Sequence, residues 1–208
     1  MPKKHVITKE RILAVEGKDE GEFFKALLQH QKIDTFQVFP MDGKDRFKNE
    51  LPLLMSTDGF SRVHTLGFIR DAEEKEAGSA FQSICGTLKK SGLPVPKKID
   101  AIIQKAKMRI GVFIMPNNLD EGMLEDLCIA SVRITPLFQC LERYLACCSA
   151  CLPAVEAIKN PSKAMIQAYL ACKSPIINSL GVAAQKGYWD FDHACFSDIK
   201  GFLRGLAV

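Results

Sequence analysis

Acidic side chains follow three of the four apolar segments in the first 116 residues. They are Glu16 and Glu20, Asp71 and Glu73, and Glu125 and Asp126. Carboxylates that converge repel one another and raise one another's pKa unless a cation neutralises them. Mg²⁺ and Mn²⁺ prefer oxygen ligands, and two such ions can hold both reacting oxygens of a phosphodiester. If the fold brings the three groups together, they predict divalent-metal-dependent phosphodiester hydrolysis.

A simpler explanation competes at each single position. Carboxylates at strand ends and in first helical turns are also favoured by solvation and by the helix dipole. Glu16 fits this explanation least, because it directly follows an apolar run and precedes Gly17, which is typical of a tight turn from strand to helix. We therefore interpret Glu16 as a side chain that is held at a fixed point.

The segments before these acids have the pattern of buried strands. Short apolar runs bounded by turn residues cover residues 11–17, 35–43, 63–71 and 109–116. Helical periodicity covers residues 20–31, 47–56 and 79–92 between them. Strict alternation of this kind favours an α/β fold, with a mainly parallel sheet flanked by helices. Ligands of such sheets bind beyond the carboxyl ends of the strands, which is where the acids lie.

The second half of the chain has helical patterns separated by Pro, Gly or Asn. We predict an α/β domain over residues 1–130 and a helical C-terminal appendage over residues 131–208 that packs on it. The appendage contains the segment CCSAC at residues 147–151, which raises the question of a zinc or iron–sulfur site. Apolar residues recur every three or four positions from Leu137 to Cys151, so we interpret this segment as a core helix instead.

Composition limits the class of protein. The chain has 208 residues of which 47% are hydrophobic, enough for a sizeable core, and its net charge of +4 permits a nucleic-acid partner without requiring one. No apolar run approaches the roughly 20 residues that span a bilayer, and the first residues lack the apolar centre of a secretory leader. We expect a cytoplasmic protein with reduced cysteines and no membrane contact.

Lysines near the acidic segments are candidate phosphate ligands. Lys18 lies inside the first acidic segment, and Lys44 follows the second predicted strand beside Gly43, whose backbone could approach a phosphate. A surface turn is the alternative at Lys44. A separate group, Lys89, Lys90, Lys97 and Lys98, could follow a nucleic-acid backbone, although a lysine-rich loop is more often only solvated.

Three motifs carry a resemblance to a known family. VEGKDE at residues 15–20 and the pair Asp71-Ala72-Glu73, with the alternating elements between them, resemble a Toprim domain. This domain is the metal-binding module of topoisomerases, bacterial primases and the overcoming-lysogenization-defect nucleases, and the resemblance covers residues 10–130. With GMLEDL at 122–127 and AAQKGYWDFDH at 183–193, the whole chain resembles a small family of stand-alone Toprim-like proteins.

The resemblance implies roles for individual residues. Glu16 matches the family's invariant glutamate, implied to be a metal ligand or general acid/base, and Asp71 and Glu73 match the paired catalytic metal ligands. Glu20, Glu125 and Asp126 are implied to complete or support a second metal site. Glu73 stands where the family usually has aspartate, so its longer side chain shifts the expected metal position.

The implied function is that of an Mg²⁺- or Mn²⁺-dependent nuclease acting on DNA or RNA. The alternative is a non-catalytic Toprim-like binding or regulatory subunit of a larger nucleic-acid-processing complex, for example one with an ATPase partner. Phosphoryl or nucleotidyl transfer to a small substrate is a third possibility.

Overall fold

The fold is built on one five-stranded sheet, in a computed structural model that describes residues 6–41, 43, 47–74, 76–99 and 101–208. In spatial order the strands are β2 (Phe36–Pro40), β1 (Arg11–Val15), β3 (Thr65–Asp71), β5 (Met108–Met115) and β4 (Ile103–Lys105). All neighbours pair in parallel except β4, which is antiparallel to β5. The prediction of a mainly parallel sheet flanked by helices is therefore confirmed. Strand β4 was not predicted, since it has only three residues and two of them are exposed.

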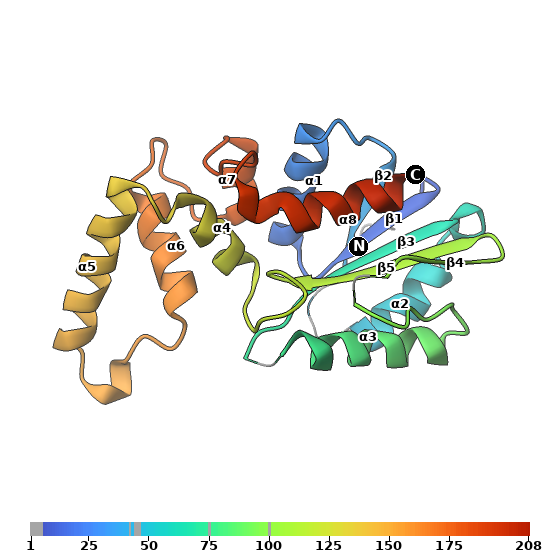
Figure 1. The fold of residues 1–208 in the computed structure, drawn as a ribbon, viewed down its shortest axis with the longest axis horizontal. Coiled ribbons are helices and arrows are strands. Elements are labelled where there is room, and N and C mark those ends of the chain that lie inside the picture. The colour runs from blue at the N-terminus through green and yellow to red at the C-terminus, as the bar shows by residue number, and fades with distance from the viewer. Residues whose placement is uncertain (1–5, 42, 44–46, 75, 100) are drawn as a thin grey trace.

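Helices cover both faces of this sheet (Figure 1). Helices α1 (Lys18–His30) and α8 (Ser197–Ala207) lie on one face, and α2 (Phe47–Met55) and α3 (Ala77–Lys90) lie on the other. Successive strand residues point to opposite faces, so Leu13 packs in the core beneath α1 and α8 while Ile12 packs in the core beneath α2 and α3. This two-sided burial explains why the strand segments read as almost continuously apolar.

The C-terminal helices share a core with the first half of the chain. They are α4 (Leu124–Val132), α5 (Pro136–Cys151), α6 (Pro161–Ala171) and α7 (Leu180–Gln185), followed by α8. Helices α5 and α6 form an arm beyond the sheet, whereas α8 returns to it (Figure 1). Arg109 of β5 donates a hydrogen bond of 2.7 Å to the Gly205 carbonyl of α8. One hydrophobic core contains residues from both sides of the boundary predicted at residue 130, so the packing does not mark it. The boundary remains a prediction.

The interpretation of α5 as a core helix is wrong for most of its length. Phe138 and Leu141 are buried, but Tyr144 is 58% exposed, and Cys140 and Cys151 are exposed too. The reason is the position of the arm, where α5 packs against α6 while its opposite side faces solvent. Within the described part of the chain, no helix combines the length and apolar character needed to cross a bilayer.

Two glycines let α8 approach the sheet closely. Gly67 of β3 and Gly111 of β5 are partners in the strand register. A β-carbon at Gly67 would lie 2.7 Å from the Leu206 side chain of α8, and one at Gly111 would lie 2.8 Å from Phe202. Side chains at these positions would push α8 away from the strands.

We predict that Gly67→Ala destabilises the protein by about 1 to 3 kcal/mol, because the added methyl group overpacks the contact with α8. Urea unfolding measures the change. The control is Gly86→Ala in α3, where a β-carbon meets nothing within 4 Å. That change should stabilise the helix by about 0.5 to 1 kcal/mol. Equal stability of Gly67→Ala and the wild type would contradict this account of the packing.

Candidate active site

Glu16 lies directly after β1, where backbone contacts fix its position. The Met41 N–H donates to the Val15 carbonyl and the Gly43 N–H donates to the Glu16 carbonyl, both at 2.8 Å. The Glu16 carboxylate accepts a hydrogen bond from the Asp71 N–H, yet its Oε2 atom is buried and has no hydrogen-bond partner among the described residues. A buried, unpaired carboxylate oxygen is costly, so a ligand that binds there would relieve that cost.

The electrostatic environment of Glu16 combines burial with neighbouring charges. Burial raises the pKa of Glu16 above its ordinary value, and the carboxylates of Glu20 and Glu73 raise it further. The Asp71 N–H and the Arg70 guanidinium oppose this rise in pKa. Glu16 therefore belongs to a group of acids that destabilise one another's charged forms.

Asp71 ends β3 on the neighbouring strand. Its Oδ1 atom accepts a 3.1 Å hydrogen bond from the Leu124 N–H, at the first residue of α4. Burial raises the pKa of Asp71 well above its ordinary value, and the carboxylates of Glu16, Glu125 and Glu20 add to the rise. Asp71 thus lies between acids from three other segments of the chain.

Glu20 and Glu125 come from the first turns of α1 and α4. Burial raises the pKa of Glu125, with further contributions from Glu20 and Asp126, while its own backbone N–H and Lys163 oppose the rise. The structure therefore brings together four predicted site residues, which we call the acidic cluster: Glu16, Glu20, Asp71 and Glu125.

Glu73 lies at the edge of this cluster. It has φ of 60°, an uncommon conformation for glutamate, and its backbone exchanges two 2.8 Å hydrogen bonds with Gly122. These bonds join the end of β3 to the segment before α4. The Glu73 carboxylate is close enough to Glu16 to raise its pKa.

Asp126 is placed differently from the other predicted ligands. Its Oδ2 atom accepts a 2.8 Å hydrogen bond from the Met123 N–H, and its Oδ1 atom accepts one from the Ser162 hydroxyl of α6. Both oxygens are therefore engaged in capping α4 and in joining α4 to α6.

Asp19, the middle acid of VEGKDE, has a similar structural role. Its carboxylate accepts hydrogen bonds from the Leu180 N–H at 2.8 Å, from the Gly181 N–H at 2.9 Å and from the Ser179 hydroxyl. A β-carbon at Gly181 would lie 2.5 Å from the Asp19 carbonyl oxygen, so α1 and α7 touch closely. Asp19 thus fixes the helix turn that carries Glu20.

Among the predicted phosphate ligands, Lys18 is exposed on the first turn of α1, whereas Lys44 lies outside the described residues. The structure adds two cations that sequence reasoning missed. Arg70 lies beside Glu16 and donates a 3.1 Å hydrogen bond to the Ser83 hydroxyl, and Lys163 of α6 lies beside Glu125. Arg70 could have been found, because it precedes Asp71 at a strand end. Lys163 reaches the site only through the folding of the arm.

The donors at this edge fit a hard divalent cation in type. They are carboxylate oxygens of acids that raise one another's pKa, and one of them, Glu16 Oε2, is buried with no hydrogen-bond partner among the described residues. Across the described ranges, however, no three or more histidine, cysteine, aspartate or glutamate side chains are placed to hold one ion together. An ion held there in the described arrangement would therefore have one or two carboxylate ligands, with water or substrate oxygens as the others.

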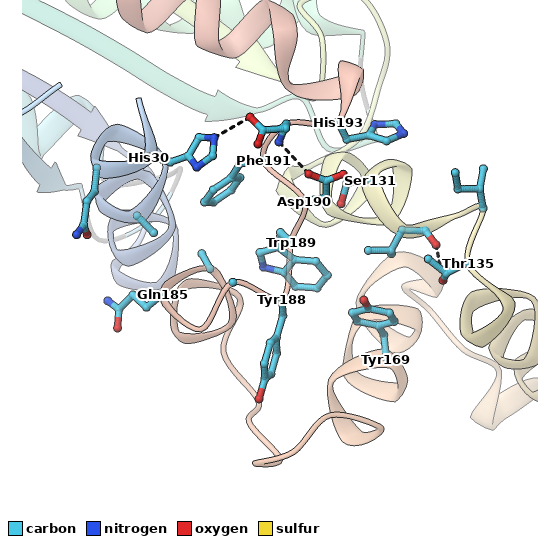
Figure 2. Close-up of a pocket in the computed structure, with 17 residues that line it drawn as sticks. His30, Ser131, Thr135, Tyr169, Gln185, Tyr188, Trp189, Asp190, Phe191 and His193 are labelled. Atoms are coloured by element: carbon cyan, nitrogen blue, oxygen red, sulfur yellow. Dashed lines mark hydrogen bonds and ion pairs between the residues drawn. The ribbon is translucent and has the colours of Figure 1, made fainter. Parts of the chain in front are cut away.

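A cavity of about 760 Å³ lies apart from the acidic cluster, and no residue of the cluster lines it. Figure 2 shows it between α1, α4, α6, α7 and the segment from Tyr188 to His193. Trp189 is 3% exposed, stacks on Tyr169 at 5.4 Å and donates a hydrogen bond to the Leu180 carbonyl. The aromatic segment near the C-terminus thus acts as a packing anchor.

The sheet and the acids at its carboxyl edge define an α/β protein with an acidic strand-end site. The chain matches the family described as "Protein of unknown function (DUF3226)" over residues 10–208, and it belongs to this family. None of the curated proteins matches it.

Two solved structures have a similar fold. One is the C-terminal region of the Burkholderia pseudomallei OLD protein, with 14% identity, a TM-score of 0.53, and coverage of 97% of this chain and 100% of that one. The other is the C-terminal region of the Xanthomonas campestris pv. campestris OLD protein, with 12% identity, a TM-score of 0.51, and coverage of 97% and 98%. At this identity the likeness shows the fold alone, and it extends over nearly the whole of both chains.

We predict that Asp71→Asn makes the protein more stable than the wild type when EDTA removes divalent ions. The folded-state pKa of Asp71 is raised, so the wild type loses stability as the pH rises from the ordinary pKa of 3.8 towards the folded value. The asparagine keeps the Oδ1 acceptor and carries no charge. Thermal unfolding measures the difference, which should grow with pH and vanish in acid.

The control for this prediction is Glu142→Gln, a change of the same kind at an exposed position on α5. Its stability relative to the wild type should not depend on pH in the same way. A wild type that is more stable than Asp71→Asn at neutral pH without metal would contradict the electrostatic account of the cluster.

Proposed function

We propose that this protein is a divalent-metal-dependent nuclease with a Toprim-like acidic site. The observation that carries the proposal is the convergence of Glu16, Asp71 and their acidic neighbours on the carboxyl edge of the sheet, with a buried Glu16 oxygen that has no hydrogen-bond partner in the described part of the chain. Solvation explains single exposed acids, but it does not explain acids that are partly buried and raise one another's pKa.

In this proposal the acidic residues have different roles. Glu16 and Asp71 would hold Mg²⁺ or Mn²⁺, assisted by Glu73, and Glu20 and Glu125 would support a second ion. When bound, the ion supplies neutralising charge for the phosphodiester during hydrolysis. Glu16 would be a ligand or exchange a proton with the attacking water. Asp126 would hold α4 in place rather than bind the ion, because both of its oxygens already accept hydrogen bonds.

Cations around the acidic cluster suit a phosphate substrate. Lys163 faces Glu125 from the arm, Arg70 lies beside Glu16, and Lys18 is exposed on the first turn of α1. Positive side chains around an acidic metal site would orient a phosphodiester and screen its charge from the carboxylates. A nucleic acid, DNA or RNA, is the substrate class that this arrangement favours.

A second candidate function is that of a non-catalytic binding or regulatory subunit. Two observations favour it. Among the described residues, no three or more acids, histidines or cysteines are placed to hold one ion. Both OLD structures are C-terminal regions of longer proteins, and this chain covers nearly the whole of each of these regions. In this alternative, a partner protein such as an ATPase would supply the remaining parts of a nucleic-acid-processing complex.

We predict that Glu16→Gln lowers Mn²⁺-dependent cleavage of nucleic acid by about 10²-fold or more, because it removes the central charge of the site and keeps the side chain's shape. The assay follows cleavage of single-stranded and duplex DNA and RNA. Thermal unfolding confirms that the variant is folded, and Glu142→Gln serves as the matched control with wild-type activity.

Two results would contradict this proposal, the first its active site and the second its activity. Cleavage by Glu16→Gln at the wild-type rate would exclude Glu16 from the reaction. A wild type that cleaves none of these substrates with Mg²⁺ or Mn²⁺, but co-purifies with an ATPase, would instead support the regulatory function.

A further inference from the structure

A basic groove runs between α1 and the edge strand β2. It has a volume of about 740 Å³, and it is lined by residues of both elements, of the loop between them and by Thr8 and Lys9. Its charged lining residues are three lysines, Lys9, Lys25 and Lys32, and one aspartate, Asp34. The groove therefore carries a net positive charge and suits a polyanion.

The lysines are placed by the geometry of α1. Lys18 and Lys25 are seven residues apart, which puts them on one side of the helix and about 10.5 Å apart along its axis. Lys32 follows after seven more residues, just past the helix end, and lines the same groove. Lys18 thus lies next to the acidic cluster and Lys32 in the groove. Glu22, one turn after Lys18 on the same side of α1, lies between Lys18 and Lys25 and pairs with Lys25.

Local contacts hold the groove in shape. Gln37 of β2 accepts hydrogen bonds from the Thr8 N–H at 2.8 Å and from the Lys9 N–H at 3.3 Å. The Lys9 ammonium group donates to the Asp34 carbonyl. Lys25 pairs with Glu22 at 2.6 Å, but its side chain stays 53% exposed. The fold therefore fixes the Lys9 ammonium group in the groove, while Lys25 and Lys32 line it from exposed positions.

We propose that this groove binds the phosphate backbone of the nucleic acid that reaches the acidic cluster. The inference rests on the proposed function for the position of the cut, while the binding it describes does not require cleavage. Its support is the net positive charge of its lining and the seven-residue spacing that places Lys18, Lys25 and Lys32 along one side of α1, towards the acidic edge. Lysines bind phosphates as point charges without reading sequence, so the groove would hold a strand irrespective of its bases.

The test compares the salt dependence of binding in two triple variants. The groove variant carries Lys9→Gln, Lys25→Gln and Lys32→Gln. The control variant carries Lys105→Gln, Lys107→Gln and Lys159→Gln, with the same change of charge at exposed positions outside the groove. Lys105 and Lys107 flank the turn between β4 and β5, at the opposite edge of the sheet from β2. Fluorescence anisotropy measures binding of short single-stranded and duplex DNA and RNA with Ca²⁺ in place of Mg²⁺ or Mn²⁺.

The groove variant should bind at least about tenfold more weakly than the wild type, and its slope of log K against log salt should be smaller by about 2. The control variant should keep the wild-type slope. Both variants should unfold at the wild-type temperature, because the changed side chains are exposed.

The remaining outcomes separate this inference from the proposed function. Groove-dependent binding by a wild type that never cleaves would uphold the groove and reject the nuclease. Cleavage by the wild type, with equal slopes for all three proteins, would reject the groove and leave the nuclease intact. Binding of polyglutamate but of no nucleic acid would also overturn the inference, and would identify the groove as a site for acidic peptides.

Discussion

Mutual repulsion among partly buried carboxylates is the constraint on which the rest of this structure depends. Glu16, Asp71 and Glu125 are each held where burial and neighbouring charge raise the pKa. Their positions are not the ones that folding alone would favour, because exposed acids would be less costly. The surrounding packing offsets this cost in free energy. Such an arrangement is typical of sites whose charged groups bind a ligand.

Other acids at the same edge stabilise the frame that holds the cluster. Asp19 joins the first turn of α1 to α7, and Asp126 joins the first turn of α4 to α6. Glu20 and Glu125 are the sequence neighbours of these two residues, so each of these two cluster acids lies beside an acid that is hydrogen-bonded to the C-terminal helices. The helical second half therefore positions the cluster in addition to completing the core beneath α1 and α8.

The sequence predicts the parts of this site that depend on local patterns. Glu16 and Asp71 could be identified because each follows a strand, and parallel strands place their carboxyl ends at one edge. The separate roles of Asp19 and Asp126 could not be identified, since their partners lie on α7 and α6, far along the chain. Strand β4 was not predicted, because it is too short to show a periodic pattern. The exposure of α5 could not be predicted either, because periodicity shows an apolar stripe but not whether another element covers it.

The central claim is that the acidic cluster binds a divalent cation, and calorimetric titration of Mn²⁺ tests it most directly. The wild type is compared with the double variant Asp71→Asn, Glu73→Gln, which keeps the side-chain shapes and removes two charges. The account predicts binding to the wild type and its loss in a variant that remains folded. Equal binding to both proteins, or no binding to the wild type in the presence of a nucleic acid, would contradict it.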